Sequence, residues 1–149
     1  MKSALLITFA AIVLSVFTGT AFAQAPQVDS TVPAQNQLNV SVSTDISVTF
    51  DIDMDAATIN DSTFLVNGMS TGLHAGTITY DAPSKTATFN PSIDFANGEI
   101  VTVVLTGGVE SSAGTPLVDY AWSFTTAADD GYGTFANSVN CSAGDAPRF

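Results

Sequence analysis

Polar and apolar residues alternate without interruption over residues 45–55, DISVTFDIDMD. The odd positions hold aspartate, serine or threonine, and the even positions hold Ile46, Val48, Phe50, Ile52 and Met54. A period of two is typical of a β-strand with one face in a core and the other in water. A helix would bring residues 50 and 54 together and rotate residue 52 away from them. The alternation therefore predicts a half-buried strand.

Other short segments show similar strand patterns. They are QLNVSVS, TFLVNG, GTITYD, KTATFNP, EIVTVVLTGG and DYAWSFTT. TFLVNG is predicted to end in a turn at Asn67 and Gly68, and GTITYD is predicted to pair with KTATFNP through the loop around APS. No long amphipathic helix is evident, and MDAATINDS has room for one helical turn.

About seven short strands separated by turns predict an all-β protein, an antiparallel β-sandwich. A small closed barrel is the alternative. The large side chains expected in the core are Phe50, Phe64, Phe89, Trp122 and Phe124, because buried aromatic residues contribute most to such a core.

The first 23 residues have the order of a cleavable secretory signal peptide. A positive start at Lys2 precedes an apolar segment, residues 4–17, and the small-x-small sequence Ala21-Phe22-Ala23 follows. The apolar segment is shorter than the 18 or so residues of a membrane span. We expect cleavage after Ala23 and therefore a secreted, extracellular or cell-envelope protein with no membrane insertion after cleavage.

The charge of the chain excludes some partners. Cleavage would remove Lys2 and take the formal charge from −11 to −12, leaving Lys85 and Arg148 as the basic residues. Such a chain cannot neutralise phosphates, so we expect no nucleic-acid binding, and anionic membranes would repel it. Cys141 is the only cysteine, so the fold has no internal disulfide; its role stays open between a free thiol and a link to another chain.

Asp51, Asp53 and Asp55 are the candidates for metal binding, and calcium is the cofactor to consider. An EF-hand would need glycine at position 56 and glutamate at position 62, which are Ala56 and Ser62 here. Alternate strand carboxylates lie about 7 Å apart and repel by about 0.6 kcal/mol in water, so no cation is required. We favour a solvated strand face, with a calcium site as the alternative. Glycoside hydrolysis by two of these aspartates would need one carboxyl with a pKa raised by burial, which an exposed strand face does not provide.

Other catalytic signatures are weak. His74 is the only histidine, so it cannot form a zinc site without other ligands, and we expect it in an exposed loop. G-x-S-x-G occurs once, as Gly68-Met69-Ser70-Thr71-Gly72, but no helix is predicted after it, as a nucleophile elbow would require. The glycine pairs lack a phosphate-loop fingerprint. The sequence predicts no enzyme activity.

Several segments together resemble bacterial Ig-like domains of the SbsA type. They are PQVDSTVPAQNQLNVSVSTDISVTFDIDMDAATI, TATFNPSIDFANGEIVTVVL, GVESSAGTPL and WSFTT, which span about residues 25–127. The chain departs from that pattern at Ile100, where the family often has tyrosine, which we expect to be a core-facing exchange. The resemblance implies a seven-stranded Ig-like sandwich, usually a non-catalytic module.

These observations divide the chain into residues 1–23 as signal peptide, 24–127 as the Ig-like domain, and 128–149 as a linker or the start of a further repeat. FANSVNCSAGDAPRF in the last part resembles the start of an FG-GAP or VCBS-type repeat. We expect a monomer, or part of a multidomain chain, that acts as spacer or interaction module with an unknown protein or polysaccharide partner at the cell surface. The alternatives are a calcium- or carbohydrate-dependent adhesion module and an accessory domain of a larger extracellular hydrolase.

Overall fold

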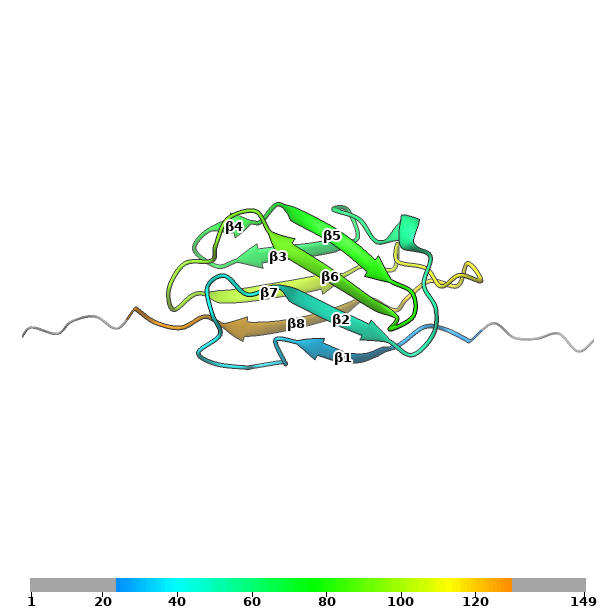
Figure 1. Cartoon of the computed structure of the whole chain (residues 1–149), viewed down its shortest axis with the longest axis horizontal. Helices are drawn as coiled ribbons and strands as arrows, with labels where there is room; N and C mark the ends of the chain where they lie inside the picture. Colours follow the sequence, from blue (N-terminus) through cyan, green and yellow to red (C-terminus); the bar gives the residue numbers. More distant parts are fainter. Residues whose placement is uncertain (1–23, 130–149) are drawn as a thin grey trace, which may run out of the picture.

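The computed structural model describes residues 24–129, which form two four-stranded antiparallel sheets packed face to face (Figure 1). The first sheet has the order β1 (Val28–Val32), β2 (Ile46–Phe50), β6 (Thr86–Pro91) and β5 (Gly76–Asp81). The second has the order β4 (Gly72–Leu73), β3 (Phe64–Gly68), β7 (Ile100–Leu105) and β8 (Tyr120–Thr125). A 3₁₀ helix, η1 (Ala56–Thr58), is the one helix in this part of the chain. The two orders correspond to ABED and C′CFG, so the fold is an Ig-like sandwich.

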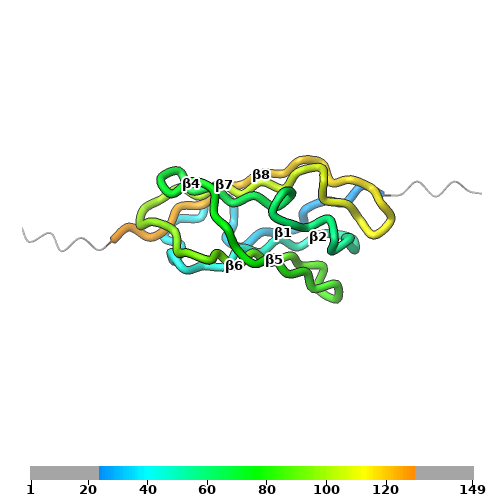
Figure 2. Tube along the Cα trace, turned by 90° about the horizontal axis from the view of Figure 1, so that it is seen from above, coloured from blue at the N-terminus to red at the C-terminus, as the bar shows by residue number. Residues whose placement is uncertain are grey.

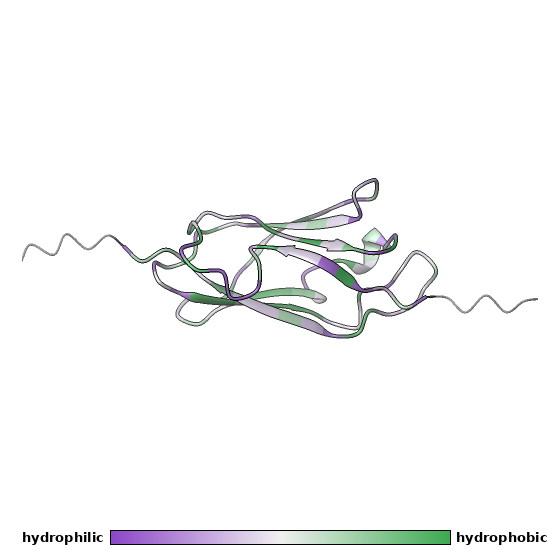
Figure 3. Ribbon diagram, turned by 90° about the horizontal axis from the view of Figure 1, so that it is seen from below, coloured by the Kyte–Doolittle hydropathy of each residue, from purple (hydrophilic) through white to green (hydrophobic). Residues whose placement is uncertain are grey.

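The core lies between the sheets because every second side chain points inward. In β2, Ile46, Val48 and Phe50 are buried while Ser47 and Thr49 are half-buried on the outer face. The same alternation gives the ribbons their hydrophobic and hydrophilic bands in Figure 3. All five aromatic residues expected in the core are at most 2% exposed, which confirms that prediction; they are Phe50, Phe64, Phe89, Trp122 and Phe124.

The segment QLNVSVS, predicted as a strand, forms only one isolated bridge, between Val40 and Thr126. Residues 36–40 instead lie along the outer edge of β8. The amide of Asn36 donates to the carbonyl of Ser123 at 2.7 Å, and the amide of Thr125 donates to the carbonyl of Gln37 at 2.8 Å. These bonds satisfy an edge that would otherwise be open, so the prediction of a strand was wrong, although Val40 is buried.

The strand predicted over residues 45–55 is also shorter than expected. The chain bends at Asp51 and Ile52, after β2 ends at Phe50. Asp51 and Ile52 are both half-buried, and the inward orientation returns at Met54, which is buried and forms an isolated bridge with Ser111. The turn predicted at Asn67 and Gly68 is wrong as well, since both residues belong to β3. The pairing of GTITYD with KTATFNP is confirmed as β5 with β6.

The two ends of the described chain lie at opposite ends of the long axis of the sandwich (Figures 1 and 2). The segment before β1 leaves at one end, and the segment after β8 leaves at the other. Within residues 24–129 no helix is long and apolar enough to cross a membrane. The predicted signal peptide, Cys141 and the predicted FG-GAP or VCBS-type repeat lie outside the described residues.

The alternation in β2 can be tested by placing the same charge on either face. Val48→Asp puts an unpaired carboxylate into the core, and we expect it to destabilise the protein by more than about 4 kcal/mol or to prevent folding. The neighbouring control, Ser47→Asp, should cost less than about 1 kcal/mol because its side chain faces outward. Urea unfolding followed by the fluorescence of Trp122 measures both, and equal costs would contradict the register.

Candidate functional site

The three aspartates proposed for calcium have separate surroundings. The half-buried Asp51 accepts hydrogen bonds from the side chain of Gln24 at 2.9 Å and the amide of Gln27 at 2.7 Å. Asp55 caps η1, because its Oδ1 accepts from the amide of Ala57 at 3.0 Å. Asp53 is exposed. Among residues 24–129, no three His, Cys, Asp or Glu side chains form a group that could hold a metal ion. Calcium binding by these aspartates stays a prediction.

A buried carboxylate that the sequence analysis did not single out lies near the C-terminal end of the sandwich. Glu99, 3% exposed, lies immediately before β7. Its Oε1 accepts from the amides of Ser70 and Thr71 at 2.7 and 2.8 Å and from the Thr71 hydroxyl at 2.9 Å. Its Oε2 accepts from the amide of Ala96 at 2.9 Å. The carboxylate thus ties the turn between β3 and β4 to the loop before β7.

These donors determine the charge of Glu99. Burial by itself would raise the pKa of the carboxyl, but the hydrogen bonds from Ala96, Thr71 and Ser70 together outweigh it and hold the pKa below its ordinary value of 4.5. Gly68 provides the necessary space, since a Cβ there would overlap Thr71 Oγ1 and Glu99 Oε1. A glycine inside a strand is often explained by such a close approach.

Thr71 connects the carboxylate to His74. Its Oγ1 lies 2.6 Å from Nε2 of His74 and donates its single proton to Glu99. The imidazole must therefore carry a proton on Nε2 and donate it to Thr71 Oγ1, and Nδ1 is the ring nitrogen that does not face Thr71. His74 lies in the loop between β4 and β5, as expected, but it is half-buried, with its ring centroid 4.5 Å from that of Phe95, so the expectation that it is exposed is wrong.

This arrangement differs from a nucleophilic triad in one decisive respect. In a triad the histidine removes the proton of the hydroxyl, and the acid is hydrogen-bonded to the histidine. Here the acid is hydrogen-bonded to the hydroxyl, and the imidazole donates to that oxygen. His74 therefore cannot act as a base toward Thr71 while Glu99 is ionised. The cluster stabilises a loop and is not arranged for acyl transfer.

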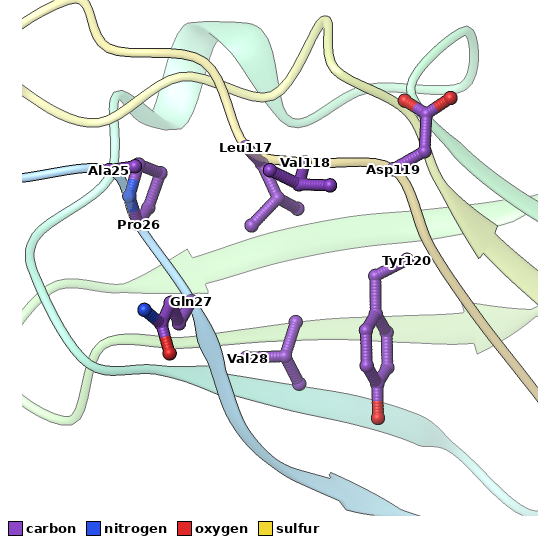
Figure 4. Close-up of a pocket in the computed structure, with 8 residues that line it drawn as sticks. All are labelled: Ala25, Pro26, Gln27, Val28, Leu117, Val118, Asp119 and Tyr120. Carbon is purple, nitrogen blue, oxygen red and sulfur yellow. The ribbon is translucent and has the colours of Figure 1, made fainter.

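The surface of the described chain has hollows, and three of them have defined linings. Two, of about 170 and 260 Å³, flank Leu73, His74 and Ala75. The third, of about 330 Å³, lies between residues 25–28 and 117–120. Figure 4 shows Val28 and Val118 in this hollow and the Asp119 carboxylate directed away from Gln27. Asp119 is engaged elsewhere, because its Oδ1 accepts from the amide of Gly107 at 2.6 Å. The hollow offers mainly apolar contact.

The alternation of β7 could have revealed Glu99. Val101, Val103 and Leu105 are buried, so the same parity places residue 99 on the inner side. It also places Ile100 on the outer side, where it is 42% exposed. The expectation of a core-facing Ile100 is therefore wrong.

The geometry thus defines a class: an Ig-like sandwich whose described residues include a buried structural carboxylate and no assembled catalytic group. Residues 23–126 match the model of a family described as bacterial Ig-like domain, and the chain belongs to that family. Domains of this family are generally non-catalytic modules. A comparison with curated proteins finds no match.

Solved structures of similar fold come from different proteins. Domains 1–6 of the surface-layer protein SbsC superpose with a TM-score of 0.55 and 24% identity, over 70% of this chain and 14% of that one. The copper resistance protein PcoC from Escherichia coli gives a TM-score of 0.52 and 16% identity, over 67% and 98% of the two chains. CopC from Methylosinus trichosporium OB3b gives a TM-score of 0.52 and 17% identity, over 70% of this chain and 96% of that one. At these identities the likeness shows the fold alone.

Replacing the buried carboxylate tests its role. Glu99→Gln should destabilise the protein by about 1–3 kcal/mol at pH 7. All four partners of the Glu99 carboxylate are N–H or O–H donors, so the NH₂ group of glutamine, itself a donor, would face at least one of them and leave it without an acceptor. Because the pKa of Glu99 is lowered in the folded state, the stability that its carboxylate contributes is fully present above pH 4.5 and is lost as the pH falls through the folded-state pKa. The difference in unfolding free energy between wild type and variant should therefore narrow below pH 4.5.

Urea unfolding from pH 3 to pH 7 measures this difference. Glu110→Gln is the control, because the Glu110 side chain makes no hydrogen bond within the described residues, and it should change stability by less than about 0.5 kcal/mol. A Glu99→Gln cost that is constant across this pH range would contradict the account.

Proposed function

We propose that this chain is a non-catalytic spacer or interaction module of a secreted or cell-envelope bacterial protein. The observation that carries the proposal is the position of the chain ends at opposite ends of the long axis (Figure 1). A domain built this way adds its full length between whatever precedes and whatever follows it. Modules whose ends lie together would add little separation.

The family and the fold support this role. The SbsC structure is a surface-layer protein, and the present chain corresponds to 14% of it, so sandwiches of this kind occur as small parts of longer surface proteins. PcoC and CopC, in contrast, are almost wholly covered by the match. The order of motifs noted in the sequence favours the SbsA-type group within the family, and a following FG-GAP or VCBS-type repeat belongs to the same proposal.

The arrangement of polar groups further supports a module without turnover. Glu99 and Thr71 are held by each other, and Asp51 and Asp55 are occupied with main-chain donors. Calcium- or carbohydrate-dependent adhesion and a role beside a hydrolase remain alternatives, but no contact among the described residues favours either. A partner at the cell surface, protein or polysaccharide, is part of the proposal.

Export and processing of the full chain test the proposed location. Expressed in a bacterium with a C-terminal tag, the chain should appear in the envelope or medium with Gln24 as its first residue. Ala23→Asp should block cleavage, because the enzyme that removes signal peptides requires a small residue there, whereas Ala25→Asp should be processed normally. Mass spectrometry of the tagged product distinguishes the forms. A wild-type chain that keeps Met1 and stays in the cytosol would contradict the proposal.

A further inference from the structure

The strand β5 differs from the other three edge strands of the described sandwich, which are β1, β4 and β8. The edge of β8 is closed by residues 36–40, β4 has only two residues, and β1 contains a register shift between Val28 and Ser30. β5, at the margin of its sheet in Figure 1, pairs with β6 over its whole length without a shift. It contains no proline, lysine or bulge, the features with which proteins usually protect an edge strand.

The main-chain groups on the outer edge of β5 have no partner among the described residues. The amide of Ser92 donates to the carbonyl of Ala75 at 2.9 Å, one step before the paired register begins. Bonded and non-bonded pairs alternate in an antiparallel ladder, so every second residue from Thr77 to Asp81 is bonded to β6. The remaining residues point their N–H and C=O groups away from β6; they are Gly76, Ile78 and Tyr80. The edge therefore presents an unfilled row of main-chain donors and acceptors.

One of the hollows described above lies beside this edge, between the two sheets. It has a volume of about 170 Å³, and its lining includes Phe64 and Leu65 of β3 and Phe89 of β6. The ring of Phe89 reaches the inner side of β5 at Gly76, since a Cβ there would overlap it. An apolar cavity of about 150 Å³ can hold benzene, so this hollow has room for one aliphatic or aromatic side chain. A strand added to β5 would point every second side chain toward the gap between the sheets.

The charge around the hollow is negative. Asp61 lines it and is exposed, and its carboxylate accepts no hydrogen bond within the described residues. Asp94, also exposed, lines the neighbouring hollow of about 260 Å³. Lys85 is the one lysine or arginine among residues 24–129, and its Nζ donates to the carbonyl of Asp51 at 2.7 Å. The complementary partner is therefore basic.

We propose that the outer edge of β5 binds an extended segment of a partner protein, and that this segment combines apolar and basic residues. The segment adds a fifth strand to the sheet β1-β2-β6-β5, places an apolar side chain in the hollow, and faces Asp61 with a lysine or arginine. In strand addition, main-chain hydrogen bonds give affinity and pockets for alternate side chains give specificity. This inference rests on the interaction role proposed above and names the class of partner.

Other occupants fit the edge less well. A polysaccharide has no alternating N–H and C=O groups to match those of β5. A second copy of this chain would bring the same carboxylates, and its Lys85 is engaged in the same way. Like charges brought together at an interface oppose binding.

Synthetic heptapeptides test the proposal. One set begins and ends with lysine and alternates threonine with valine, leucine or phenylalanine; a matched set has glutamate in place of each lysine. We titrate each peptide into the ¹⁵N-labelled chain from Gln24 to Phe149. At least one lysine peptide should shift the amide signals of Gly76, Ile78 and Tyr80 and slow their hydrogen exchange. Its glutamate counterpart should bind about 10-fold more weakly or worse, because it meets Asp61 with a like charge.

N-methylation of the bound peptide separates strand addition from a general attraction between charges. In an added strand, one alternate set of peptide amides donates to β5 and the other set faces water. Methylating the first set should weaken binding about 10-fold, and methylating the second should weaken it less than about 2-fold. Equal effects of the two sets would contradict strand addition.

A pair of charge-matched variants locates the site. Asp61→Lys should weaken binding of the lysine peptide about 10-fold, because it places a like charge at the hollow. Asp29→Lys makes the same change at an exposed position of β1, the opposite edge strand of the same sheet, and should weaken binding less than about 3-fold.

Three results would overturn the proposal. They are a lack of binding by all the lysine peptides at millimolar concentration, amide shifts that lie outside β5 and the hollow, and a dimer formed through β5 without peptide, as sedimentation equilibrium would show. Because these measurements use the purified chain, their failure is distinguishable from a failure of export and processing.

Discussion

The packing of two sheets across one apolar layer is the constraint on which the structure depends. Phe64 from β3 and Phe89 from β6 meet across it with ring centroids 5.8 Å apart. The ring centroids of Phe64 and Trp122 are 6.5 Å apart. With Cys141 as the only cysteine, no internal disulfide reinforces this layer. Burial of each such side chain contributes about 1.5–3 kcal/mol, so the apolar side chains at the inward positions are the main source of the sandwich's stability.

Polar groups close the open margins of this sandwich. Trp122 Nε1 donates to the carbonyl of Pro33 at 3.1 Å, which holds the segment after β1 against the second sheet. Glu99 and Thr126 join the turn before β7 to the segment after β8, because the amide of Glu99 donates to Thr126 Oγ1 at 2.7 Å. Every buried side-chain nitrogen and oxygen in the described residues has a partner. The polar clusters are thus explained by stability, which agrees with a non-catalytic family.

Periodicity made the fold predictable, whereas the site required three-dimensional contacts. GTITYD was recognisable because polar and apolar residues alternate along it, and EIVTVVL because it is rich in β-branched residues. QLNVSVS, residues 37–43, was misassigned because its backbone makes only a few bonds along the edge of β8 and no strand ladder, which the sequence does not encode locally. Gly68 was taken for a turn signal, although it makes room for Glu99. The donors around Glu99 come from two loops about 25 residues apart, Ser70 and Thr71 in one and Ala96 in the other, so no local motif indicates them.

A double-mutant cycle on Phe64 and Phe89 tests the central claim directly. These residues come from different sheets, and each can be shortened to leucine without introducing a polar group. The account predicts a coupling energy of about 0.5–1.5 kcal/mol in the free energy of unfolding, because the two rings touch only when the sheets are packed as described. Effects of Phe64→Leu and Phe89→Leu that add within about 0.3 kcal/mol would show that the rings do not meet and would contradict the packing.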